Sequence, residues 1–156
     1  MTNKIKIIMA NNPLNILLAE DDEDDRFFFK EAIDKVKIKT VLTMVNDGVE
    51  LMEYLNNPEN TNPHVVFLDL NMPRKGGIEC LQEIRSNKKF SNLTIAIYST
   101  SASDNDIEET FVKGANIYIR KPNDFKILQK VISEVLSVNW QYHTSGLNKD
   151  HFVLSI

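Results

Sequence analysis

The chain is predicted to fold as an α/β domain in which a doubly wound, five-stranded parallel sheet carries helices on both faces. Three observations indicate this class: short apolar runs recur along the sequence, segments of helical periodicity separate them, and polar turn residues mark the boundaries. Buried parallel strands are continuous apolar runs, and strict alternation with helices is typical of right-handed crossovers. The expected strand order is 2-1-3-4-5, which places the first and third strands side by side.

Each element of this fold has its own pattern in the sequence. The predicted strands are residues 15–19, 41–45, 65–68, 94–98 and 116–120. Apolar residues at helical spacing predict a helix after every strand: Phe29, Ile33 and Val36; Met52 and Leu55; Ile78, Leu81 and Ile84; Ile107 and Phe111; and Leu128, Val131, Ile132 and Val135. Asp104 and Asn123 are the expected N-caps of the last two helices.

Length and composition limit the class of protein. The chain has 156 residues, 42% of them hydrophobic and 26% charged, which fits one domain, residues 14–140, between an N-terminal extension, 1–13, and a C-terminal tail, 141–156. A net charge of −4 disfavours nucleic-acid binding, and no apolar run approaches the ~20 residues needed to cross a membrane. The single cysteine, Cys80, excludes an internal disulfide. We therefore expect a cytoplasmic protein that binds neither nucleic acid nor membrane.

Four of the five predicted strands run into residues that can carry chemistry. The first ends at Glu20-Asp21, the third at Asp69, the fourth at Ser99-Thr100 and the fifth at Lys121. Ligands of open α/β sheets bind outside the carboxyl ends of the strands, so these side chains are expected to share one crevice. Taken singly, each has an ordinary interpretation: Glu20 to Asp25 as a solvated acidic turn with Asp22 or Asp24 as a helix cap, and the others as caps or loop residues. Their convergence favours a functional site.

The predicted crevice suits a divalent cation and a phosphoryl group. Two carboxylates about 4 Å apart repel by roughly 4 kcal/mol at an effective dielectric constant near 20, so positive charge must compensate for three of them. Mg²⁺, which binds oxygen ligands, and the ammonium of Lys121 can supply this positive charge. Asp69, which follows a strongly apolar strand, is the best candidate for a nucleophile. Lys121 precedes Pro122, and a cis peptide there would aim the lysine into the site.

The chain resembles the receiver domains of two-component response regulators over about residues 14–140. The resemblance rests on Glu20-Asp21, on Asp69-Leu70-Asn71-Met72-Pro73 with Gly77 eight residues after the aspartate, on Ser99, and on Lys121-Pro122. It implies a flavodoxin-like fold. The segment from Asp69 to Gly77 and the long terminal segments are similar, more particularly, to stand-alone regulators that pair with phytochrome-type histidine kinases.

The resemblance also implies a role for each matching residue. Asp69 would accept the phosphoryl group; Glu20, Asp21, Asp69 and the backbone carbonyl of Asn71 would bind Mg²⁺; Ser99 would donate a hydrogen bond to the phosphoryl group; Lys121 would pair with it; and Tyr118 would change rotamer as the switch. Ser99 stands where the family more often has threonine, and Thr100 follows it, which leaves open which hydroxyl faces the site. Asn71 and Ser101 stand at positions that tune dephosphorylation in the family.

The expected function is therefore a stand-alone phosphorylation switch rather than an enzyme. It would take a phosphoryl group from a histidine kinase or histidine phosphotransfer protein, assist its own phosphorylation and dephosphorylation, and contact a downstream protein through the fourth helix, the Tyr118 strand and the last helix. Homodimerisation through that face is a further alternative. The alternatives are a receiver-like module that works without phosphorylation and, less favoured, a small Mg²⁺-dependent phosphatase, which would want an acid where this chain has Asn71.

Overall fold

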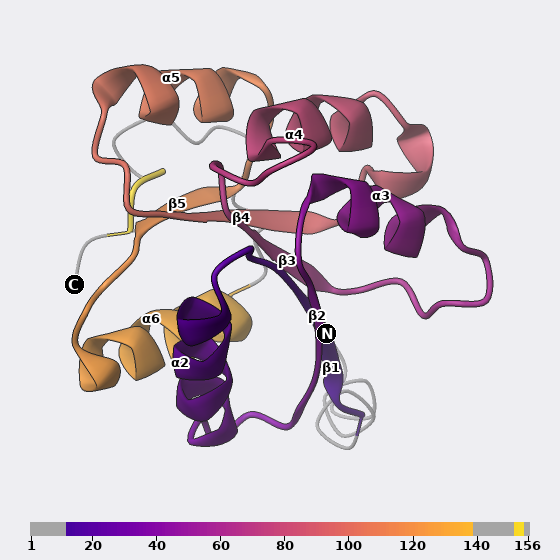
Figure 1. The fold of residues 1–156 in the computed structure, drawn as a ribbon. Coiled ribbons are helices and arrows are strands. Elements are labelled where there is room, and N and C mark those ends of the chain that lie inside the picture. Colours follow the sequence, from indigo (N-terminus) through magenta and orange to yellow (C-terminus); the bar gives the residue numbers. More distant parts are fainter. Residues whose placement is uncertain (1–11, 139–151, 155–156) are drawn as a thin grey trace.

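Five apolar segments form a parallel sheet in a computed structural model of the chain, which describes residues 12–138 and 152–154 (Figure 1). The strands are β1 (Leu14–Ala19), β2 (Thr40–Val45), β3 (Val65–Leu68), β4 (Thr94–Ser99) and β5 (Ile117–Arg120). Their order is β2-β1-β3-β4-β5, and every neighbouring pair is parallel. The predicted fold class and strand order are confirmed, with strand ends within one residue of the predicted ones.

Helices cover both faces of the sheet, as predicted. They are α2 (Glu23–Asp34), α3 (Gly48–Asn56), α4 (Gly77–Arg85), α5 (Asp104–Val112) and α6 (Phe125–Ser137), with a short 3₁₀ helix, η1 (Lys88–Phe90). Figure 1 shows α3, α4 and α5 on one face and α2 and α6 on the other. This three-layer arrangement leaves the carboxyl ends of the strands open along one edge.

The two faces of the sheet bury separate hydrophobic cores. Successive strand residues point to opposite faces, so Leu17 and Ala19 pack beneath α3 and α4, whereas Ile16 and Leu18 pack against α2 and α6. Every residue of β3 and β4 is buried, as expected for central strands covered on both sides. Cys80 is buried in the first core.

Side-chain capping begins four of the five described α-helices at residues with an oxygen acceptor. Asp22 caps α2, since Oδ1 accepts a hydrogen bond from the Asp25 N–H at 2.9 Å; this resolves the alternative between Asp22 and Asp24. The predictions of Asp104 and Asn123 as caps are each wrong by one residue. Ser103 and Asp124 take these positions, because their backbones are extended and their side chains reach the N–H group three residues on.

The edge of β5 carries a segment from the C-terminal part of the chain. The Tyr118 N–H donates to the Phe152 carbonyl and the Leu154 N–H donates to the Tyr118 carbonyl, both at 3.0 Å. The side chain of Phe152 is only 1% exposed and packs edge-on against Phe111 of α5 and Tyr118. Residues 1–11, 139–151 and 155–156, which include most of the predicted extension and tail, lie outside the described residues.

Candidate functional site

The ends of β1 and β3 bring the acidic residues of the predicted site together. The register pairs Ala19 with Leu68, and the Asp69 N–H donates to the Ala19 carbonyl at 3.1 Å. The residues that follow each strand, Glu20 and Asp69, therefore lie next to one another at the carboxyl edge. The first and third strands thus lie side by side, as predicted.

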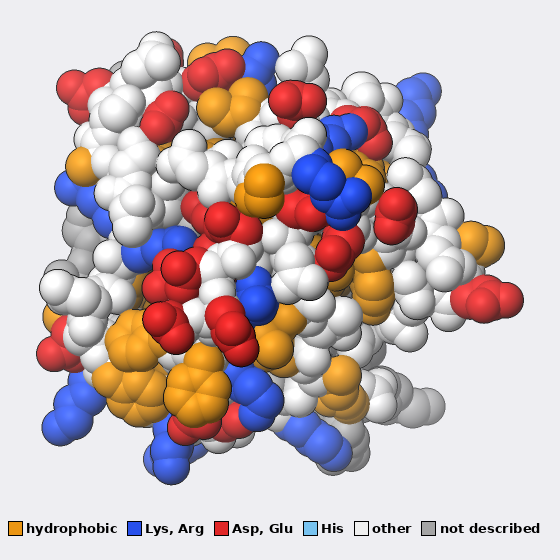
Figure 2. Space-filling model, viewed as in Figure 1, with side chains coloured by type: hydrophobic (Ala, Val, Ile, Leu, Met, Phe, Trp, Pro, Cys, Tyr) orange, Lys and Arg blue, Asp and Glu red, His pale blue; other side chains and the backbone are white. Residues whose placement is uncertain are grey.

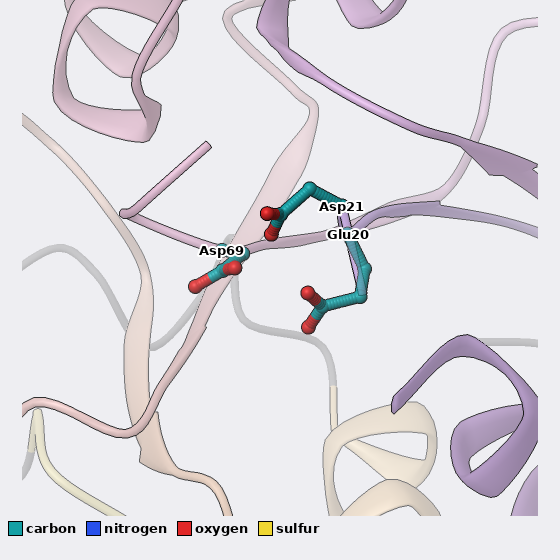
Figure 3. Close-up of side chains that lie close together, drawn as sticks. All are labelled: Glu20, Asp21 and Asp69. Atoms are coloured by element: carbon teal, nitrogen blue, oxygen red, sulfur yellow. The ribbon is translucent and has the colours of Figure 1, made fainter. Parts of the chain in front are cut away.

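Three carboxylates gather at this edge. One oxygen each from Glu20, Asp21 and Asp69 lies within 4.8 Å of the other two, and Figure 3 shows them facing a common space from the ends of β1 and β3. Glu20 and Asp69 are buried, whereas Asp21 is exposed. The Asp22 N–H donates to Glu20 Oε2 at 3.1 Å, and the Asn71 N–H is 3.5 Å from Asp69 Oδ1. The backbone thus orients two of the three acids.

Burial disfavours the ionised forms of Glu20 and Asp69 when no metal cation balances their negative charge. Desolvation by burial, together with the nearby charge of Asp69, raises the pKa of Glu20 to about 7, although Lys121 and the Asp22 N–H act in the opposite direction. Desolvation also raises the pKa of Asp69, partly offset by the charge of Lys121. Both groups therefore hold protons more tightly than exposed acids do. A bound cation would restore their charged forms.

The donor set fits a hard divalent cation. All three side chains offer carboxylate oxygens, the ligands that Mg²⁺ and similar ions prefer, and Asp21 opens to solvent so that waters can complete the coordination. Glu20 Oε1 is buried without a hydrogen bond of good geometry from the described residues, although it forms an ion pair with Lys121. The residues predicted to bind Mg²⁺ through their side chains are thus together. The Asn71 carbonyl remains a prediction as the fourth ligand.

Lys121 enters the same cluster from the end of β5. Its side chain is 10% exposed and its ammonium pairs with Glu20, with Asp25 Oδ2 at 3.0 Å and with Asp69 Oδ2 at 3.7 Å. The Lys121 N–H donates to the Ser99 carbonyl at 2.8 Å, which anchors the start of the loop. Every described peptide bond is trans, so no cis bond before Pro122 aims the lysine into the site. The parallel pairing of β4 with β5 already delivers the lysine to the edge.

Asp25 is a member of the site that the sequence did not single out. It lies in the first turn of α2, where an acidic run normally indicates a solvated helix start. In the fold its Oδ2 accepts a hydrogen bond from the ammonium of Lys121, 96 residues away in the sequence. No local pattern reveals such a contact, because it depends on how α2 lies against the end of β5.

The hydroxyl of Ser99 lies inside the protein and that of Thr100 outside. Ser99 ends β4 and is fully buried, and its Oγ accepts a hydrogen bond from the Ser101 N–H at 3.1 Å. Thr100 is exposed and lines a cavity beside Lys121. Of the two hydroxyls that the sequence left open, Ser99 is the one that points inward at the carboxyl edge.

Tyr118 is buried on β5 with its hydroxyl directed to the loop after β4. Its ring is fully buried, and its hydroxyl donates to the Ser101 carbonyl at 3.0 Å. Ser101 in turn donates from its own hydroxyl to Asp106 Oδ2 at 2.6 Å, at the start of α5. The predicted switch residue is therefore connected to the segment that follows Ser99. Its change of rotamer remains a prediction.

The loop between Asp69 and Gly77 has a tightly constrained backbone. A Cβ at Gly77 would lie 2.2 Å from the Asp69 carbonyl oxygen, so only glycine allows this close approach. Arg74 has a positive φ of 64°, and its Nε donates to Asp47 Oδ2 at 2.7 Å. The Arg74 hydrogen bond lowers the pKa of Asp47. The loop that presents Asp69 is thereby fastened to the start of α3.

Acidic and aromatic groups share the face that carries the site. Figure 2 shows carboxylates gathered near the centre of this face and a hydrophobic patch over α2 and α6. In the patch, Phe27 is 64% and Ile127 40% exposed, while Phe28 and Phe125 form an edge-on pair. The run Phe27-Phe28-Phe29 thus divides, with Phe29 in the core and Phe27 at the surface. Among the described residues, no helix is long and apolar enough to span a bilayer.

Comparison with known proteins identifies the family of this site. The model of the response regulator receiver domain matches residues 16–133. Response regulator Rcp1 of Synechocystis sp. is 30% identical over 135 residues, which cover 82% of this chain and 90% of Rcp1. Chemotaxis protein CheY1 of Helicobacter pylori is 26% identical over 126 residues, which cover 81% of this chain and 99% of that protein.

Solved structures agree with the sequence matches. The phosphorylated cyanobacterial phytochrome response regulator RcpA has a TM-score of 0.75 at 27% identity, covering 84% of this chain and 96% of RcpA. The Mn²⁺-bound form of Rcp1 has a TM-score of 0.72 at 26% identity, covering 87% of this chain and 98% of that one. Because the family match runs from β1 into α6 and is supported by a relative at 30% identity, this chain belongs to the response regulator receiver domain family.

Proposed function

We propose that this receiver domain takes a phosphoryl group from a phosphohistidine onto Asp69 in a Mg²⁺-dependent reaction. The donor would be a histidine kinase or a histidine phosphotransfer protein. One observation carries the proposal: the carboxylates of Glu20, Asp21 and Asp69 lie within 4.8 Å of one another, and the Lys121 ammonium lies 3.7 Å from Asp69. Phosphoryl transfer requires a nucleophile, a cation and a positive side chain around one point, and this arrangement of carboxylates and ammonium supports these roles.

In the proposed reaction an oxygen of Asp69 attacks the phosphorus atom. A P–O bond forms as the P–N bond of the phosphohistidine breaks, and the electron pair remains on the imidazole nitrogen, which takes up a proton. Bound Mg²⁺, held by Glu20, Asp21, Asp69 and the Asn71 carbonyl, would neutralise charge on the phosphoryl oxygens. Lys121 would pair with a phosphoryl oxygen, so the domain assists its own phosphorylation and, with water as acceptor, its dephosphorylation.

The signal would leave the domain through changed protein contacts. Ser99 is buried at the end of β4, ready to donate to a phosphoryl oxygen, and Tyr118 is hydrogen-bonded to the backbone two residues after Ser99. We propose that both rearrange on phosphorylation and alter the face made by α5, β5 and α6. A downstream protein is the proposed partner of that face, and a second copy of the chain is the alternative.

The comparisons support this proposal. RcpA was solved in a phosphorylated form and Rcp1 in a Mn²⁺-bound form. Both share the fold of this chain, with 27% and 26% sequence identity to it. Rcp1 and CheY1 are matched over 90% and 99% of their own lengths, which favours action as a single receiver unit.

The cytoplasm remains the predicted compartment, on the basis of the composition and the single cysteine.

Intact mass measurement after incubation with acetyl phosphate tests the proposal. We expect one phosphoryl group to be added in the presence of Mg²⁺, none after its removal with a chelator, and none in Asp69→Asn. Label on the Asp69→Asn variant would overturn the assignment of the acceptor. Steady hydrolysis of phosphate monoesters would instead indicate a phosphatase, and no label under any condition would indicate a module that works without phosphorylation.

A further inference from the structure

Lys121 has a carboxylate partner outside the acid cluster. Its ammonium lies 3.0 Å from Asp25 Oδ2 but 3.7 Å from Asp69 Oδ2, and it is also paired with Glu20. Asp25 comes from α2 and its side chain is 43% exposed, so it approaches the ammonium from the solvent side. The Lys121 ammonium also lies 5.3 Å from the centre of the Tyr98 ring.

We propose that Asp25 is a positioning residue that holds Lys121 away from Asp69 until the phosphoryl group arrives. This inference rests on the proposed function, because it concerns the lysine that would pair with the phosphoryl group. Asp25 touches neither the phosphoryl group nor the metal and acts only through Lys121.

Hydrogen-bond geometry supports a competition for the ammonium. The distance to Asp25 is that of a charge-assisted hydrogen bond, whereas the distance to Asp69 is too long for one. A phosphoryl group carries more charge and three acceptor oxygens, so it attracts the ammonium more strongly than a carboxylate does. To reach it, Lys121 must shorten its distance to Asp69 and weaken its contact with Asp25. Asp25 therefore stabilises the resting form over the phosphorylated one.

The cavity beside Lys121 offers a control that separates the Asp25–Lys121 contact from the effect of negative charge in general. A cavity of about 370 Å³ opens beside the lysine, and its lining includes Asp24, Asp25, Thr100 and Lys121. Both aspartates repel an anionic phosphodonor that approaches through the cavity. Among the ion pairs of the described residues, however, only Asp25 of these two is paired with Lys121. Asp24→Asn is thus a matched control that removes the same charge from the same cavity.

The test compares binding of beryllofluoride, a mimic of the phosphoryl group, in the full-length protein with Mg²⁺. Titration calorimetry would measure its affinity for wild type, Asp25→Asn, Asp25→Ala, Asp24→Asn, Lys121→Ala and the Asp25→Asn/Lys121→Ala double variant. We expect both Asp25 variants to bind about 2- to 5-fold more tightly than wild type, the range for loss of a partly exposed ion pair. Asp24→Asn should show only the smaller gain that comes from removing a negative charge from the cavity. In the Lys121→Ala background, Asp25→Asn should have no effect.

Some results would overturn the inference alone: equal effects of Asp25→Asn and Asp24→Asn, or an Asp25 effect that persists without Lys121. Unchanged affinity in the Asp25 variants would do so as well. If wild type neither binds beryllofluoride nor takes a phosphoryl group from acetyl phosphate, the proposed function fails and the role of Asp25 fails with it. The two failures are therefore distinguishable by the behaviour of the wild-type protein.

Discussion

Tyr118 and Phe152 are joined through both main chain and side chain. The Tyr118 N–H donates to the Phe152 carbonyl at 3.0 Å, and the two ring centroids are 6.1 Å apart at an interplanar angle of 64°. The segment Phe152–Leu154 thereby satisfies hydrogen-bonding groups at an edge strand that would otherwise be open. It also covers part of the face through which the signal is proposed to leave, and it does so at the proposed switch residue itself.

Phe152→Ala should weaken the docking of this segment. Truncating a buried phenylalanine costs up to about 3–5 kcal/mol in a closed core, and less near a chain end that can relax, so we expect a loss of about 2 kcal/mol in the free energy of unfolding. Urea unfolding would measure it. Hydrogen exchange should also quicken at the Tyr118 N–H. Val112→Ala, at a residue of α5 that is 72% exposed, should leave both unchanged; equal losses in the two variants would contradict a specific role for Phe152.

Gly77→Ala should displace the loop that presents Asp69. Its Cβ would meet the Asp69 carbonyl oxygen at 2.2 Å, a clash with backbone that no side-chain rotation relieves. We expect a loss of about 1–3 kcal/mol in the free energy of unfolding and a marked fall in the rate of labelling by acetyl phosphate. Gly76→Ala is the matched control, since its Cβ would lie 3.4 Å from the Leu70 carbonyl oxygen, at ordinary van der Waals distance. A Gly77→Ala variant as active and stable as Gly76→Ala would refute the close approach.

Magnesium affinity should fall as the pH is lowered. Burial raises the pKa of Glu20 to about 7 from an ordinary 4.5. Protonated Glu20 therefore stabilises the folded state. This stabilisation is fully present below about pH 4.5 and is lost as the pH rises through about 7. Metal binding needs the ionised carboxylate and must displace the proton below about pH 7. Mg²⁺ should therefore raise the unfolding temperature more at about pH 8 than at about pH 6.

Glu20→Gln provides the control for this pH dependence. The amide keeps the shape of the side chain but does not titrate, so the difference in Mg²⁺ stabilisation between the two pH values should shrink in the variant. Asp69 retains a raised pKa and will leave some dependence. A wild-type protein stabilised equally by Mg²⁺ at both pH values would argue against Glu20 as a ligand.

Ser99→Ala should destabilise the phosphorylated form, whereas Thr100→Ala should not. Ser99 is fully buried at the carboxyl edge and Thr100 is exposed. A hydrogen bond to a charged group contributes about 1.5–3 kcal/mol, which corresponds to a loss of beryllofluoride affinity of about tenfold or more in Ser99→Ala. Calorimetric titration of the two variants measures this. A larger loss in Thr100→Ala would show that the other hydroxyl serves the site.

The strands and the acid cluster were predictable because their patterns are local. An apolar run such as Val65–Leu68 followed by Asp69 indicates both a buried strand and a polar residue at its carboxyl end. Parallel pairing then places Asp69 beside Glu20 whatever the details of the loops. The helix caps at Ser103 and Asp124 were missed by one residue, because neighbouring polar residues are equivalent in sequence and only the backbone angles distinguish them.

Contacts between distant elements required the folded chain. Nothing in the acidic run at the start of α2 distinguishes Asp25 from its neighbours, and its contact with Lys121 depends on the packing of α2 against the end of β5. The choice between Ser99 and Thr100 depends on which way β4 faces at its last residue. The apolar pattern and the order of motifs thus suffice for the architecture and for the acidic and basic residues that follow the strands. Tertiary packing decides which of them touch, because side-chain contacts across the sheet edge are set by three-dimensional distance and not by spacing along the chain.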